Sequence, residues 1–246
     1  AEGHQQMDMA AEHGVNFFDS AEMYPFPANP KTYGRTDEIV GTWLAARGQR
    51  DKIVVATKIA GPGARFEHIR GGSLKFDRTH LIQAVDDSLA RLRTDYIDLY
   101  QTHWPERPAN YFGKLGYNHD ANAEWTPFEE MLDVMAEIEK AGKVRAFGIS
   151  NETPWGLMEL MKLSESKGLP RMASIQNPYS LINRTFEVGL AEAAIRSVCG
   201  LLAYSPLGFG ALTGKYLDGA LPEGSRGALY PEFQRNFRPR GVESTA

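Results

Sequence analysis

Short apolar segments alternate with helical patterns along most of the chain, and this alternation constrains the fold more than any other feature. Six apolar segments have the length and pattern of β-strands. They cover residues 15–19, 53–58, 96–102, 145–150, 173–176 and 200–205. Strict alternation predicts an α/β fold with a parallel sheet. No strand is followed by Gly-x-Gly-x-x-Gly at the start of a helix, so we do not expect a Rossmann dinucleotide turn.

The helices between these strands carry start signals. Asp77 is an N-cap residue for the helix that precedes residue 96, and Thr153-Pro154 opens the helix after residue 150. The segment 126–129, Thr-Pro-Phe-Glu, combines a capping box with proline at the first helical position. Helical spacing predicts two further helices over residues 36–47 and 186–197.

Composition excludes several classes of protein. The net charge is −4 and no dense block of Lys or Arg occurs, so neither nucleic acid nor an anionic membrane is an expected partner. Cys199 is the only cysteine, which rules out an intramolecular disulfide and fits a cytoplasmic protein. No apolar run approaches the ~18 residues of a membrane span. We expect one domain over residues 1–246 and, because no close pair of histidines ends a strand, no metal site.

Four polar residues lie at or just past the carboxyl ends of the first three strands: Asp19, Tyr24, Lys58 and His103. In a barrel of parallel strands these ends converge on one rim, where the chemistry takes place. Each residue alone has an ordinary interpretation: a turn cap, a loop aromatic, a solvated charge and a packing residue. The combination of all four residue types at consecutive strand ends favours a catalytic site.

These residue types suit proton transfer to a carbonyl oxygen. Tyr24 would be the acid, although a free tyrosine has a pKa of ~10. Lys58 would lower that pKa by favouring the phenolate, and Asp19 would keep the lysine charged and oriented. His103 would hold the substrate oxygen where negative charge develops.

Longer motifs surround the same strand ends. They occupy residues 14–24 (with Asp and Tyr five apart), 53–58, 95–103, 142–151, 176–180 and 203–208. Together they resemble the aldo-keto reductases over about residues 3–235, and most of all the bacterial NADP(H)-dependent branch related to the β subunits of voltage-gated potassium channels. This resemblance implies a (β/α)8 TIM barrel and an NADP(H)-dependent reductase of aldehydes or ketones.

The resemblance also implies roles for residues on the later strand ends, with NADPH or NADH as the cofactor. Ser150, Asn151 and Gln176 would hydrogen-bond the nicotinamide carboxamide, and Tyr204 would stack on its ring. Ser205, Leu207, Gly208 and Lys215 would line the pyrophosphate, and Trp104 and Phe209 would form an apolar substrate wall. From the residues alone, Ser150-Asn151 also fits a turn with a helix cap, and Tyr204 fits core packing.

The sequence departs from the family at both ends. Only strands 2 to 7 of the family's eight are recognised, and the first and last strands are not found, nor is the basic segment that grips the adenosine 2′-phosphate. We therefore expect a piece of a longer reductase and an incomplete barrel. Residues 1–246 in isolation should bind NADPH weakly, and tight, saturable NADPH stabilisation in a thermal-shift titration would contradict this expectation.

Two other functions remain open from the sequence. The first is an NADPH-binding regulatory or sensor subunit with little turnover, because the channel β subunits keep the same four residues. The second is a barrel lyase that uses Lys58 as a Schiff-base amine. The substrate is a small carbonyl compound whose identity, like the oligomeric state, does not follow from the sequence.

Overall fold

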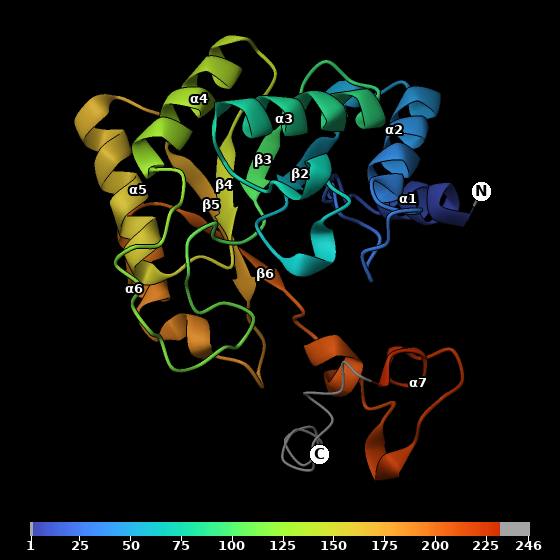
Figure 1. Cartoon of the computed structure of the whole chain (residues 1–246). Coiled ribbons are helices and arrows are strands. Elements are labelled where there is room, and N and C mark those ends of the chain that lie inside the picture. The colour runs from blue at the N-terminus through green and yellow to red at the C-terminus, as the bar shows by residue number, and fades with distance from the viewer. Residues whose placement is uncertain (1, 232–246) are drawn as a thin grey trace.

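The computed structural model of the chain describes residues 2–231, which contain one sheet of six parallel strands (Figure 1). The strands pair in sequence order, each with the next along the chain. They are β1 (Phe17–Asp19), β2 (Val54–Ile59), β3 (Leu99–Thr102), β4 (Phe147–Ser150), β5 (Met172–Pro178) and β6 (Gly200–Tyr204). The sheet curls into part of a barrel, which confirms the predicted incomplete (β/α)8 architecture.

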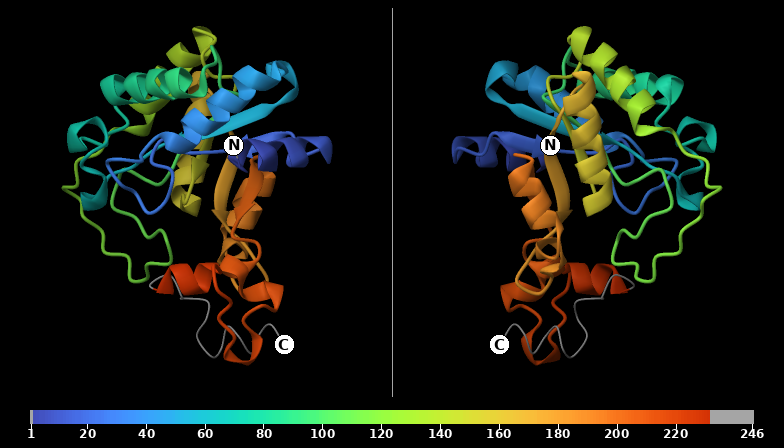
Figure 2. Two further views of the ribbon diagram at one scale, coloured as in Figure 1. Left: turned by 90° about the vertical axis from the view of Figure 1, so that its right-hand side faces the viewer. Right: turned by 90° about the vertical axis from the view of Figure 1, so that its left-hand side faces the viewer.

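Helices cover the outer face of the curled sheet, and Figure 2 shows them as an arc around it. The α-helices are α1 (Glu2–Glu12), α2 (Arg35–Arg47), α3 (Arg78–Leu92), α4 (Phe128–Lys140), α5 (Pro154–Lys167), α6 (Leu190–Arg196) and α7 (Arg226–Leu229). The segment that contains α7 extends beyond the carboxyl ends of the strands (Figure 1). None of the helices in the described part of the chain is long and apolar enough to cross a membrane.

The main core lies between the sheet and these helices. In α4, Phe128, Met131, Leu132 and Met135 are all buried against it, as the helical spacing predicts. Burying a large apolar side chain contributes about 1.5–3 kcal/mol, so this one face fixes the helix firmly. The central strands β3 and β4 are buried at every position, whereas the edge strands β1 and β6 are partly exposed. Within the described residues each edge strand pairs on one side only.

Two helix starts agree with the sequence and two helix predictions are wrong. The side chains of Asp77 and Thr153 accept hydrogen bonds from the third residue beyond them, as N-caps do. The predicted capping box at Thr126 is absent, because its backbone N–H and hydroxyl donate to Glu106 instead and α4 begins at Phe128. The predicted helix 186–197 is interrupted at Gly189, whose φ of 98° is incompatible with a continuous helix.

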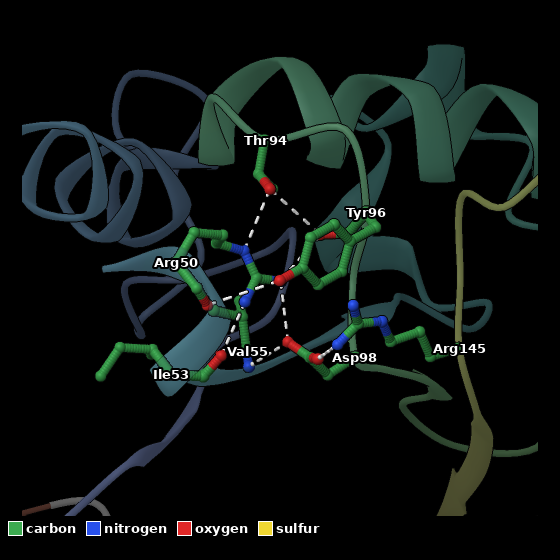
Figure 3. Close-up of polar contacts among 7 residues, drawn as sticks. All are labelled: Arg50, Ile53, Val55, Thr94, Tyr96, Asp98 and Arg145. Carbon is green, nitrogen blue, oxygen red and sulfur yellow. Dashed lines mark hydrogen bonds and ion pairs between the residues drawn. The ribbon is translucent and has the colours of Figure 1, made fainter. Parts of the chain in front are cut away.

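The predicted strand 96–102 is also too long, because β3 begins at Leu99 and Ile97 forms only an isolated bridge with Val144. A polar cluster surrounds the residues just before β3. Arg50 donates to the Tyr96 carbonyl (2.8 Å) and to Asp98 Oδ2 (2.7 Å), and Arg145 donates to Asp98 Oδ1 (3.0 Å). Each guanidinium lies 3.9 Å from the centroid of the Tyr96 ring (Figure 3). We call Arg50, Tyr96, Asp98 and Arg145 the N-terminal clasp, because they precede β2, β3 and β4. Residues at this face of a barrel stabilise the fold.

We expect Asp98→Asn to destabilise the protein without affecting the opposite rim. Asp98 also accepts the Val55 N–H at 2.9 Å, so one carboxylate joins three segments of the chain. Loss of its charge weakens two ionic hydrogen bonds and should lower the free energy of unfolding by about 2 kcal/mol. Urea denaturation measures this loss. An unchanged midpoint would show that the clasp does not contribute to stability.

Candidate active site

The structure brings the four residues of the predicted catalytic set together at the carboxyl ends of the strands. Asp19 ends β1, Lys58 lies near the end of β2 and His103 directly follows β3. Lys58 Nζ is 2.5 Å from Asp19 Oδ2 and 5.6 Å from the centroid of the Tyr24 ring. The rings of Tyr24 and His103 meet edge to face, with centroids 5.6 Å apart. The four side chains therefore form one contiguous cluster.

Lys58 is completely buried and tightly held. Besides Asp19, its ammonium donates to the Ser20 carbonyl at 2.7 Å. The second carboxylate oxygen of Asp19 accepts a hydrogen bond of 3.0 Å from Gln101 Nε2. Gln101 is the register partner of Lys58 on the neighbouring strand, so both side chains point to the same face of the sheet. Lys58 and Gln101 together fix the orientation of the carboxylate.

A glycine in the same row makes room for this arrangement. Gly148 is the register partner of Gln101, and Ser174 is the register partner of Gly148. A Cβ on Gly148 would lie 2.5 Å from Ser174 Oγ and 3.2 Å from Gln101 Cγ. The absence of a side chain at position 148 therefore lets Gln101 extend toward Asp19.

The loop that carries Tyr24 is anchored by a buried ion pair. Glu22 accepts the Ala60 N–H at 2.5 Å with one carboxylate oxygen and pairs with Arg70 through the other. Both charged side chains are almost completely buried. The loop after β1 is thus fastened to the loop after β2, which holds Tyr24 over the end of β2.

Burial dominates the electrostatics of the cluster. It raises the pKa of Tyr24 to about 12, with the Asp19 carboxylate adding to the increase and Arg226 opposing it. The net shift is upward, opposite to the decrease expected from Lys58, because burial and the Asp19 carboxylate dominate. Burial lowers the pKa of Lys58, against the opposing effect of Asp19. Burial, with Lys58 nearby, places the pKa of His103 well below 6.5, so this imidazole is neutral at neutral pH.

The sequence predicts carbonyl reduction, and for that reaction these directions predict the pH dependence. As the pH rises, Lys58 loses its proton first, below its ordinary value of 10.5, and Tyr24 follows at about 12. As the pH falls, His103 becomes protonated only well below 6.5. We therefore expect kcat/KM to show no inflection near 6.5 and to decline, as the pH rises, when Lys58 loses its proton and before Tyr24 does. An inflection near 6.5 would contradict the neutral His103.

Ser150 and Asn151 at the end of β4 form a second polar group beside the first. Asn151 Nδ2 donates to the His103 carbonyl at 2.9 Å and to Ser150 Oγ at 3.0 Å. Ser150 Oγ donates to the backbone carbonyl of Gln176 at 2.7 Å, and the Tyr204 hydroxyl donates to Asn151 Oδ1 at 2.7 Å. Asn151 has a φ of 55°, a left-handed conformation that asparagine tolerates. It therefore connects the end of β3 with the last residue of β6.

A turn with left-handed backbone follows β6. Ser205, Gly208, Phe209 and Gly210 have φ values of 54°, 56°, 59° and 97°. Within the turn, the Gly208 and Gly210 N–H groups donate to the Ser205 and Leu207 carbonyls, both at 2.9 Å. The Lys215 ammonium packs against Gly210, where a Cβ would lie 3.3 Å from Nζ. Leu207 is 55% exposed and presents its side chain to solvent.

Trp104 and Phe209, the predicted substrate wall, differ in accessibility. Trp104 is only 2% exposed, and its indole N–H donates to the Pro62 carbonyl at 3.0 Å. It packs against His103 and against Phe112, which is 43% exposed. Trp104 is therefore mainly a packing residue behind His103. Phe209 is partly exposed, and the Arg226 guanidinium lies 4.5 Å from the centroid of its ring.

Comparison with known proteins identifies the family. The model of the Aldo/keto reductase family matches residues 2–234. The chain belongs to this family. It is 49% identical over 235 residues to protein tas of Escherichia coli (strain K12), which covers 96% of this chain and 68% of that protein. An aldo-keto reductase of Babesia bovis is 39% identical over 198 residues, or 76% of this chain and 70% of that protein.

A third relative is the Probable voltage-gated potassium channel subunit beta of Arabidopsis thaliana. It is 32% identical over 235 residues, covering 94% of this chain and 62% of that protein. These relatives confirm the predicted family and its link to the channel β subunits. This aldo/keto reductase is thus an oxidoreductase of a family that typically uses nicotinamide cofactors.

Sequence reasoning missed several residues of the reductase that the structure places at the rim. Gln101 was recognised only as part of a strand, although it orients Asp19. Arg226 lies in the Gly- and Arg-rich end of the chain, yet its charge reaches Tyr24 and its guanidinium covers Phe209. Arg107 and Glu152 form a buried ion pair at the ends of β3 and β4. These pairings join residues far apart in the chain, so local spacing gives no signal for them.

Proposed function

We propose that this aldo/keto reductase reduces aldehydes or ketones to alcohols with NADPH, and that Tyr24 is the general acid. The observation that carries the proposal is the position of the Tyr24 phenol between a buried Lys58–Asp19 pair and the His103 ring. A second polar group, with Asn151 bonded to the His103 carbonyl, lies directly beside this cluster. The continuous sheet and single main core also support one domain over the described residues.

The residues present fit a nicotinamide dinucleotide. The turn that contains Gly208 and Gly210 has the Lys215 ammonium beside it and the Arg226 guanidinium over Phe209, and these two cations suit a pyrophosphate. Ser205 and Leu207 belong to the same turn, so these residues would hold the pyrophosphate. Ser150, Asn151 and the partly exposed Gln176 would hold the carboxamide, and the Tyr204 ring would lie against the nicotinamide. When bound, NADPH supplies the hydride that goes to the carbonyl carbon.

Tyr24 supplies the matching proton. As the carbonyl oxygen gains negative charge it becomes a stronger base than a phenolate, so a tyrosine with a pKa of about 12 still donates to it. The high pKa keeps Tyr24 protonated until that charge develops. The Lys58 ammonium, 5.6 Å from the ring centroid, then stabilises the phenolate. His103, being neutral, holds the substrate oxygen through a ring N–H without adding a positive charge that would compete with Lys58.

The arrangement argues against a lyase that forms a Schiff base on Lys58. The Lys58 side chain is 0% exposed, and its ammonium is engaged by Asp19 and Ser20. A substrate carbonyl would have to displace both partners before it could reach the nitrogen. Lys58 is therefore better placed to modulate Tyr24 than to act as a nucleophile.

The test is the oxidation of NADPH by the purified protein in the presence of a nitrobenzaldehyde, followed by NADPH absorbance and by product analysis. We expect the alcohol and oxidised cofactor in equal amounts, and a parallel assay with NADH measures cofactor preference. Tight binding of NADPH without turnover of any carbonyl would support a regulatory subunit instead. Absence of both binding and turnover would contradict the proposal.

A further inference from the structure

A third buried ion pair, Arg107–Glu152, lies just outside the cluster. Arg107 Nη1 donates to Glu152 Oε1 at 2.6 Å, and Nη2 donates to Glu152 Oε2 at 2.7 Å. Nη2 also donates to the Thr153 hydroxyl at 3.1 Å. The Arg107 and Glu152 side chains are only 8% and 5% exposed. We call this bidentate pair the rim clasp.

The rim clasp joins the two segments that carry the site. Arg107 follows His103 in the loop after β3, and Glu152 directly follows Asn151 after β4. The same two segments are already linked by the hydrogen bond from Asn151 Nδ2 to the His103 carbonyl. The Glu152 carbonyl in turn accepts a hydrogen bond of 3.2 Å from Asn177 Nδ2 on β5. The clasp and these two hydrogen bonds therefore link three neighbouring strand ends.

The geometry of the clasp is fixed on every side. The Arg107 guanidinium lies 4.8 Å from the centroid of Trp155 and 5.2 Å from that of Phe128. On the remaining side, a Cβ on Gly156 would collide with Glu152 Oε2 and would lie 2.6 Å from Arg107 Nη2. Space for the pair thus exists only because residue 156 has no side chain.

Stability alone gives a weak reason for such a pair. Desolvating two charges costs about as much as their attraction returns, and apolar replacements of similar volume are often neutral or better. A bidentate arginine–carboxylate pair does, however, impose a defined direction as well as a distance. A defined direction matters here, because His103 would face the substrate carbonyl and Asn151 would face the nicotinamide a short distance away.

We propose that Arg107 and Glu152 are positioning residues that hold His103 in register with Ser150 and Asn151. The clasp would thereby align the carbonyl oxygen, held by His103, with the nicotinamide, held by the β4 segment. Neither residue touches the reacting atoms. The inference rests on the proposed function, since it assigns the two segments to substrate and cofactor.

Two variants disturb the clasp in different ways. Gly156→Ala leaves every charge in place and improves helix propensity, but its methyl group displaces the Glu152 carboxylate and the Arg107 guanidinium. The double variant Arg107→Met/Glu152→Met removes both charges and retains the bulk, so it should fold. Asp98→Asn in the N-terminal clasp is the matched control, because it weakens an arginine–carboxylate pair at the opposite end of the strands.

The readouts are the melting temperature, the Kd for NADPH from fluorescence, and kcat and KM for a nitrobenzaldehyde. We expect both rim variants to fold and to lose about 10- to 100-fold in kcat/KM, with a weaker affinity for NADPH, as small misplacements in an active site do. Asp98→Asn should lower the melting temperature and leave kcat/KM unchanged.

Four outcomes would overturn the inference. Rim variants with wild-type kcat/KM and Kd would reduce the clasp to a structural ion pair. The same conclusion would follow if the loss of kcat/KM tracked the fall in melting temperature equally in the rim variants and in Asp98→Asn. A wild-type protein without NADPH binding or turnover would contradict the proposed function and the inference together. If the wild type binds NADPH but does not turn over, the Kd alone decides, and an unchanged Kd in both rim variants rejects the positioning role.

Discussion

Replacing Tyr24 by phenylalanine should lower kcat for carbonyl reduction by about 10²- to 10⁴-fold, the range that a positioned general acid contributes. The substitution removes one hydroxyl and keeps the ring that packs edge to face on His103. The affinity for NADPH should therefore stay close to that of the wild type. Steady-state rates with a nitrobenzaldehyde and a fluorescence titration with NADPH measure the two effects separately.

Tyr33→Phe is the matched control for this experiment. Tyr33 lies in the same loop after β1 and packs edge to face on another histidine, His68, with centroids 5.7 Å apart. Tyr33 belongs to no part of the proposed site, so removing its hydroxyl should leave kcat unchanged. If Tyr24→Phe retains most of the wild-type activity, another group supplies the proton and the proposed role of Tyr24 is wrong.

The second large effect concerns stability. Asp19→Asn should lower the free energy of unfolding by about 3–5 kcal/mol, because it removes the compensating charge beside a buried ammonium. Lys58 is 0% exposed, so water cannot replace the lost partner. Carbonyl reduction should be lost as well, since a Lys58 that gives up its proton no longer stabilises the Tyr24 phenolate. Chemical denaturation at neutral pH measures the stability, and the NADPH assay measures the activity.

The pH dependence of that loss separates the charge effect from a general packing defect. Burial already holds the pKa of Lys58 below 10.5, and Asp19 opposes this shift. In the Asp19→Asn variant the pKa of Lys58 should fall further, because the carboxylate that opposed the shift is gone. The unfolded chain then binds a proton that the folded chain lacks, so stability should rise with pH up to about 10.5. The double variant Asp19→Asn/Lys58→Met should regain most of the stability but none of the activity. If the double variant is as unstable as Asp19→Asn, the buried charge is not the cause.

The strands and the residues at their ends could be located from the sequence because both depend on local patterns. Apolar runs placed Lys58, His103 and Ser150 at the ends of β2, β3 and β4, and the structure has them there. The convergence of those ends followed from the alternation of strands and helices. Parallel pairing in sequence order then brings the ends together without any information about individual contacts.

The supporting polar contacts were not predictable in the same way. Gln101 and Asp19 are 82 residues apart in the chain, and Arg107 and Glu152 are 45 apart. The capping box at Thr126 was misjudged for the same reason, since its hydrogen-bond partner is Glu106 rather than a residue of its own helix. Each of these contacts depends on which loops the fold places side by side, and spacing along the chain does not contain that information.

The direction of the Tyr24 pKa shows a further limit. Residue types alone suggested that a nearby lysine would lower it. The sign depends on how deeply the phenol is buried and on the Asp19 carboxylate near it, and both are properties of the folded chain. The pKa of about 12 therefore reflects desolvation more than the neighbouring charge.

The order of the strands has a mechanical consequence. Asp19 ends β1, and Tyr204, the residue expected to lie against the nicotinamide, ends β6. Five successive strand pairings therefore separate these two residues. Neighbouring strands are rotated by about 20–25° on average, and small changes in this twist add up across the pairings. The distance between the ends of β1 and β6 therefore depends on sheet curvature, and a substitution deep in β3 or β4 can change it without touching either strand.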